Sequence, residues 1–213
     1  MPSEHPKYGD ASYLVFLVED IIFQVPRRRL KQSRYFQDML EDAHTGAGSE
    51  GKDNEHPISL GGISAFEMTS FLDVLETSVL YDDPGPTFSQ WAAALHLATM
   101  WDFDDIRERI IVQMDKNISE VEPMDRVDAS LKCRVEKWLH PAYEVLCTRD
   151  AGPSDAEAER LGVLRLNGIW RIREALKSTA STPTQSSCNC NSCRNGRPSC
   201  SDLLKKEEAL KFP

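Results

Sequence analysis

The chain opens with two short β-rich runs, and these constrain the fold more than any other feature of the sequence. The runs are Tyr13–Val18 and Ile21–Val25, and only Glu19 and Asp20 separate them. Two apolar runs joined by two polar residues predict a β-hairpin. Pro26 follows directly and is expected to end the second strand, because proline has no backbone N–H for the ladder.

After the hairpin, the apolar residues change to the three- and four-residue spacing of helices. The predicted helices span residues 29–41, 64–75, 91–101 and 102–114. Ser33 is expected to cap the later part of the first, and Ser64 with Glu67 predicts a capping box on the second. A short strand is expected at 57–60, and the Gly- and Ser-rich residues 43–57 are expected to form an exposed, mobile loop. The predicted class is therefore α+β, with a small sheet flanked by helices.

Beyond Pro123 the pattern is helical alone, and it stops near residue 177. Ser154 and Glu157 predict a helix start, and Gly162 a helix end. Residues 178–201 contain no Leu, Ile, Val or aromatic residue, so they cannot bury enough apolar surface to fold. At most a transient helix is expected at 202–211. The predicted parts are a flexible N-terminus (1–11), a compact domain (12–120), an all-helical extension (121–177) and a disordered C-terminal tail with cysteines (178–213).

The first half of the chain is strongly acidic, which bears on the class of partner. Residues 1–123 carry 10 Lys and Arg against 22 Asp and Glu. Nucleic acid is not expected as a partner, because phosphate binding requires a clustered basic surface. The one basic cluster of this half, Arg27–Lys31 with Arg34 close behind, is predicted to be a solvated first helical turn or loop, with a patch for phosphate or an acidic partner as the alternative. No apolar run reaches membrane-spanning length and residues 1–10 are polar, so no membrane is expected and the cytoplasm or the nucleus is the expected location.

No motif of a common enzyme class is present, neither Gly-x-Ser-x-Gly nor a glycine-rich phosphate loop. Cys133 and Cys147 lie among apolar residues at helical spacing, which favours packed thiols over a nucleophile paired with His140. The four tryptophans, Trp91, Trp101, Trp138 and Trp170, are expected in the core, with a partner anchor as the alternative for one of them. We predict no enzymatic activity and no cofactor.

Four cysteines gather in the tail: Cys188, Cys190, Cys193 and Cys200. Four thiolates can hold a tetrahedral Zn²⁺, so these are the candidate metal ligands. The layout differs from a structural zinc finger, because Cys188 is only two residues from Cys190 and no second Cys-x-x-Cys pair follows. Redox or modification chemistry is an alternative. The third alternative is an unstructured tail whose cysteines have no such role. We predict this third alternative, a disordered tail that binds no stoichiometric metal.

Six segments, in order, resemble fungal BTB/POZ-domain proteins. They are Val18–Pro26, Tyr35–Leu40, Pro57–Gly62, Leu97–Glu108, Trp138–Leu146 and Glu159–Gly162. The resemblance covers roughly residues 12–176. Many family members have a histidine where this chain has Pro26, but fungal members share the proline.

The resemblance implies a non-enzymatic assembly module that associates with itself or with another protein. In this family such domains self-associate, bind cullin-type ubiquitin-ligase scaffolds or recruit transcriptional co-factors. It brings no catalytic residues. The expected function is thus an adaptor, with co-factor recruitment and metal binding through the tail cysteines as alternatives.

Overall fold

The computed structural model describes residues 13–42, 50–76, 85–181 and 199–211. The chain divides into two compact units, Met1–Asn117 and Ile118–Pro213, and each is described by itself. The predicted class is confirmed, because a small three-stranded sheet with helices is followed by helices alone. Within the described ranges, no helix combines the length and the apolar character needed to cross a membrane.

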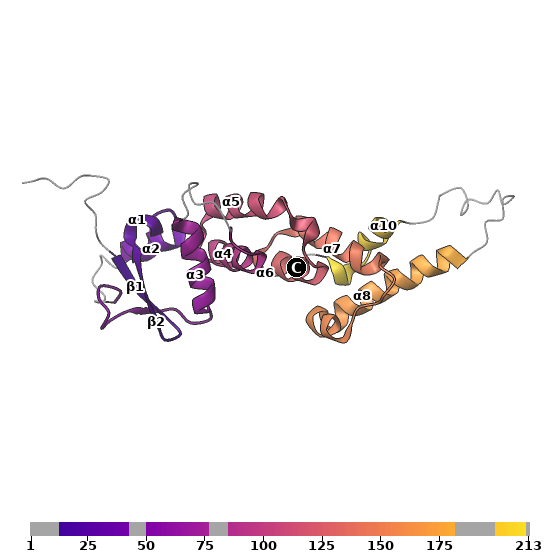
Figure 1. The fold of residues 1–213 in the computed structure, drawn as a ribbon, viewed down its shortest axis with the longest axis horizontal. Helices are drawn as coiled ribbons and strands as arrows, with labels where there is room; N and C mark the ends of the chain where they lie inside the picture. Colours follow the sequence, from indigo (N-terminus) through magenta and orange to yellow (C-terminus); the bar gives the residue numbers. More distant parts are fainter. Residues whose placement is uncertain (1–12, 43–49, 77–84, 182–198, 212–213) are drawn as a thin grey trace, which may run out of the picture. The chain divides into compact units, whose positions relative to one another are not determined.

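Unit 1 begins with the predicted hairpin, formed by β1 (Tyr13–Val18) and β2 (Ile21–Pro26) (Figure 1). The strands pair antiparallel with Val18 opposite Ile21, so Glu19 and Asp20 make the turn. Glu19 takes a left-handed φ of 53°. The third strand, β3 (Ile58–Ser59), pairs parallel to β1, and the order across the sheet is β2-β1-β3. The buried β1 therefore lies in the middle, and β2 forms one edge.

The segment before β3 differs from the expected mobile loop. Residues 43–49 lie outside the described ranges, and residues 52–56 are exposed as predicted. However, the backbone N–H of Val15 on β1 donates to the Gly51 carbonyl at 2.9 Å, and Gly51 N–H donates to the His56 carbonyl at 2.6 Å. Asp53 accepts the backbone N–H of His56 at 2.9 Å. Residues 50–57 are thus tied to the sheet, because a left-handed Gly51 (φ 77°) lets the chain approach β1 closely.

The described residues of unit 1 also form five helices: α1 (Arg27–Leu30), α2 (Arg34–Asp42), α3 (Ala65–Glu76), α4 (Phe88–Met100) and α5 (Asp104–Asp115). Ser33 caps α2 through a bond from Phe36 N–H, as predicted. The predicted capping box of α3 is also present, since Ser64 and Glu67 exchange hydrogen bonds. Glu67 additionally bonds His96 on α4 at 2.9 Å. Local caps and one cross-helix contact therefore fix where these helices begin and how α3 meets α4.

An aromatic cluster forms the centre of unit 1. Its members are Phe16, Phe36, Phe71, Trp101 and Phe103, all buried. Phe36 contacts the rings of Phe16, Trp101 and Phe103 at centroid distances of 5.9, 5.3 and 6.0 Å. Edge-to-face and tilted pairs of this kind stabilise a core beyond their area burial. The cluster joins β1, α2, α3 and the end of α4, so it fixes the sheet against the helices.

The described residues of unit 2 form helices, 3₁₀ turns and the loops that join them, with no strand among them. Over residues 118–181 its elements are a 3₁₀ turn, η2 (Ile118–Glu120), and three helices, α6 (Pro123–Cys133), α7 (Glu136–Thr148) and α8 (Asp155–Ser181). The predicted capping box at the start of α8 is present, since Ser154 and Glu157 exchange hydrogen bonds. Gly162 has non-helical angles, φ 70° and ψ 164°, so α8 breaks where a helix end was predicted.

At both described ends of residues 178–213, where a disordered tail was predicted, the structure has helical elements. Helix α8 runs on to Ser181, and residues 199–211 form α10 (Cys200–Leu204) and a 3₁₀ turn, η3 (Glu208–Leu210). Cys200, Leu204 and Leu210 are buried in the same core as α7 and α8. Residues 182–198 lie outside the described part. The physical reason is tertiary: the segment 199–211 would be marginal alone, but its three buried apolar side chains complete a core that the rest of unit 2 leaves open.

A buried arginine organises the end of α7. Arg173 on α8 is 4% exposed, and its guanidinium donates to the carbonyl oxygens of Leu146, Cys147, Arg149 and Asp150 at 2.7–3.2 Å. These carbonyls lie at the C-terminal end of α7, where a helix leaves its acceptors unpaired and carries partial negative charge. Arg173 therefore satisfies them and locks α7 against α8.

Candidate interaction surface

The structure describes one of the four candidate metal ligands, Cys200. Cys188, Cys190 and Cys193 lie outside the described residues. Cys200 is 7% exposed and sits in the core of unit 2, within hydrogen-bonding reach of Cys147. In the ranges 13–42, 50–76, 85–181 and 199–211, no three His, Cys, Asp or Glu side chains gather as a metal site would require. The metal hypothesis is therefore untested for Cys188, Cys190 and Cys193. Its fourth proposed ligand, Cys200, is buried in an apolar core.

The cysteines considered as nucleophiles are packed side chains. Cys133 and Cys147 are 0% and 4% exposed. Burial raises the pKa of the Cys147 thiol to about 12, and the neighbouring Cys200 adds to that shift. A thiol protonated at neutral pH is a poor nucleophile and a poor metal ligand. Cys147 is thus a structural residue of the α7 core.

A cavity of about 360 Å³ opens in unit 2 between α7 and the C-terminal segment. Its lining residues are Glu136, Leu139, His140, Tyr143, Leu204, Lys205, Leu210 and Lys211. Burial raises the pKa of the Tyr143 hydroxyl to about 12, although the nearby Arg165 guanidinium opposes the shift. Lys211 is engaged by Glu208. The cavity wall is mostly apolar, as expected where one packed segment meets another.

The tryptophans behave largely as core residues. Trp101 and Trp138 are 4% and 3% exposed, which confirms the expectation for these two. Trp170 is the exposed exception at 38%; its ring packs on Gly152, where a Cβ atom would lie 2.6 Å away. The Arg173 guanidinium carbon lies 5.6 Å from the Trp170 ring centroid. Trp170 is therefore held by its own unit, which weakens its candidacy as a partner anchor.

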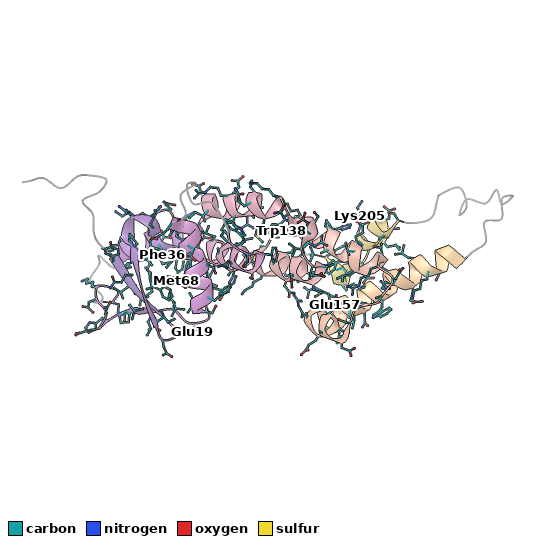
Figure 2. The ribbon with its side chains drawn as sticks, viewed as in Figure 1. Glu19, Phe36, Met68, Trp138, Glu157 and Lys205 are labelled. Carbon is teal, nitrogen blue, oxygen red and sulfur yellow. The ribbon has the colours of Figure 1, made fainter. Side chains whose placement is uncertain are left out.

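Unit 1 exposes large apolar side chains at one edge of its sheet. Ile21 and Ile22 on β2 are 49% and 39% exposed. Phe66, in the first turn of α3, is 51% exposed. The carboxylate of Glu19, at the hairpin tip labelled in Figure 2, accepts the Ala65 N–H at 3.2 Å. This bond joins the hairpin turn to the start of α3, so the apolar residues lie on two connected segments.

Opposite charges flank β2. Asp20 precedes the strand in the hairpin turn, and Arg27, Arg28 and Arg29 follow Pro26 in α1, the helical turn predicted for this cluster. Asp20 and Arg28 are exposed, and neither forms an ion pair with any residue in the described ranges. Between these ends, residues 21–25 carry no charge. The sequence displayed this pattern, but only the sheet order shows that the uncharged strand is an edge.

Comparison with protein-family models and with curated proteins finds no match for this chain. The surface must therefore be interpreted from its own chemistry. It offers apolar side chains, an edge strand whose outer side pairs with no strand of the described sheet, and flanking charges of opposite sign, which are features of protein recognition.

Proposed function

We propose that this chain is a non-enzymatic protein–protein interaction module of the BTB/POZ type, with its assembly surface on unit 1. The observation that carries the proposal is the exposed apolar edge of the sheet, at Ile21 and Ile22. Single exposed apolar residues are ordinary, whereas here two lie on an edge strand, whose outward N–H and C=O groups form a template for another chain. The order of strands and helices in unit 1 agrees with what the family resemblance predicts.

The proposal extends to the class of partner. A second copy of this chain is one partner, and a cullin-type ubiquitin-ligase scaffold is the other that the resemblance suggests. The acidic balance of residues 1–123 argues against nucleic acid. The cytoplasm or the nucleus is the proposed location. Recruitment of transcriptional co-factors is the alternative use of the same surface.

Light scattering over a concentration series and binding to a purified cullin-type scaffold test the proposal together. We expect either a molar mass that rises with concentration or a stoichiometric complex with the scaffold. A chain that stays at 24.1 kDa at every concentration and binds no scaffold would contradict the proposal. Binding instead to a transcriptional co-factor would select the alternative.

A further inference from the structure

The free edge of β2 lacks most of the protections that natural edge strands carry. Charged side chains, bulges and very short strands usually prevent edge-to-edge pairing. β2 has six residues, Ile21–Pro26, and none is charged. In the described sheet no strand pairs with its outer side. Pro26, at the end of the strand, is the one residue of a protective type, because it lacks an N–H.

The hydrogen bonds of β1 show which backbone groups of β2 face outward. Val15 N–H donates to Gly51, and the Leu17 carbonyl accepts from Leu60, both on the β3 side of β1. The residues opposite them on β2 are Gln24 and Ile22. Because hydrogen-bonded and non-bonded pairs alternate along an antiparallel ladder, Gln24 and Ile22 must point their N–H and C=O groups away from β1.

We propose that β2 pairs antiparallel with β2 of a second copy, with Gln24 opposite Gln24 about a two-fold axis. This inference rests on the proposed function and names its surface. In this register each Gln24 N–H meets the partner's Gln24 carbonyl, and each Ile22 N–H meets the carbonyl of the partner's Pro26. Every outward N–H of the strand is then satisfied, and only the Ile22 carbonyl of each copy lacks a backbone donor, because Pro26 has no N–H. The pairing would join two three-stranded sheets into one of six strands.

The flanking charges favour the same pairing. Antiparallel pairing about Gln24 brings the hairpin turn of one copy, with Asp20, beside α1 of the other, with Arg28. The two-fold axis repeats this junction, so two oppositely charged contacts form at once. The net charge of residues 1–123 opposes any self-association, which makes local complementarity the decisive electrostatic factor.

Charge reversal at the two junctions tests the pairing in the full chain. Asp20→Lys places two cations at each junction, and Arg28→Glu places two anions there. Sedimentation velocity is expected to show each variant dimerising at least about tenfold more weakly than wild type. An equal mixture of the two variants is expected to form a heterodimer, because both junctions are attractive again.

Asp20→Lys is the decisive variant, because it reduces the net negative charge. If only the repulsion between two net-negative chains mattered, Asp20→Lys would self-associate more tightly than wild type. The proposed pairing predicts that this variant self-associates more weakly. Glu108→Lys, an equal charge change on exposed α5, is the matched control and should not weaken the dimer. A wild-type dimer unaffected by Asp20→Lys and Arg28→Glu would overturn the pairing and leave the assembly function intact. A wild-type chain that is monomeric at all concentrations would overturn the pairing. If that chain also binds no cullin-type scaffold, the proposed assembly function is contradicted as well.

A cysteine at the two-fold axis tests the register. Directly opposed residues in a hydrogen-bonded pair lie about 5.5 Å apart between Cα atoms, within reach of a disulfide. Gln24→Cys should therefore cross-link to itself when diamide oxidises the two thiols, with the linked peptide identified by mass spectrometry. Ile21→Cys, which is also exposed but does not lie opposite itself in this register, should not. Cross-linking of Ile21→Cys in preference to Gln24→Cys would refute this register.

Discussion

The Gly51→Ala variant tests how residues 50–57 pack against β1. Two effects should destabilise it, backbone strain and a steric clash of the added Cβ atom, and each can be measured separately. The backbone has φ 77°, a left-handed value that costs other residues about 1–2 kcal/mol. A Cβ atom would also lie 2.7 Å from Ile58 Cδ1 and 3.1 Å from Leu14 Cδ2. Overpacking of this kind costs about 1–3 kcal/mol. The reduced entropy of the unfolded chain returns about 0.4–1 kcal/mol, so Gly51→Ala should destabilise unit 1 by about 2–4 kcal/mol.

Two nearby glycines provide matched controls. Gly62 has φ 81° but nothing within 4 Å of an added Cβ, so Gly62→Ala measures the strain alone, about 0.5–1 kcal/mol net. Gly61 has neither strain nor a close neighbour, and its alanine variant should be neutral or slightly stabilising. Urea unfolding reports the free energies, and hydrogen exchange at Val15 N–H reports the Gly51 contact directly. Equal losses for Gly51→Ala and Gly62→Ala would refute the packing of Gly51 on Ile58.

Three further outcomes follow from unit 2. Arg173→Met leaves the α7 carbonyls without their buried donor and should lower the free energy of unfolding by about 1–3 kcal/mol, measured by urea denaturation; a loss under about 0.5 kcal/mol would contradict this role. The hydrogen bond to Arg149 chiefly lowers the pKa of Glu157 from 4.5 to about 2, so the stability that it contributes is present above pH 4.5 and is lost as the pH falls toward 2. Glu157→Gln should flatten that part of a thermal-unfolding profile, and an unchanged profile would refute the linkage. Leu204→Ala should cost about 2–5 kcal/mol and expose residues 199–211 to proteolysis; protease resistance equal to wild type would refute their docking.

The features that the sequence predicted best are those determined by residues close together in the chain. The hairpin depends on two β-rich runs and a two-residue turn, and the capping boxes at Ser64 and Ser154 depend on partners three residues away. The break at Gly162 is equally local. Such features need no knowledge of the rest of the chain, because the hydrogen bonds that create them join near neighbours.

The parts that could not be predicted depend on residues far apart in the sequence. Leu204 and Leu210 looked like a marginal helix because their core partners, such as Leu139 and Ile169, lie on α7 and α8. The buried position of Arg173 has no local signal, since its acceptors lie 23 to 27 residues earlier. The interaction surface also depends on distant residues. The charges around β2 can be read from the sequence, but the strand order that makes β2 an edge cannot.

Sedimentation velocity of the full chain across a wide concentration range, with and without a purified cullin-type scaffold, tests the central claim most directly. An assembly module should sediment above its monomer mass of 24.1 kDa as its concentration rises, or enter a defined complex with the scaffold. A single species of 24.1 kDa at every concentration, unchanged by the scaffold, would contradict the account.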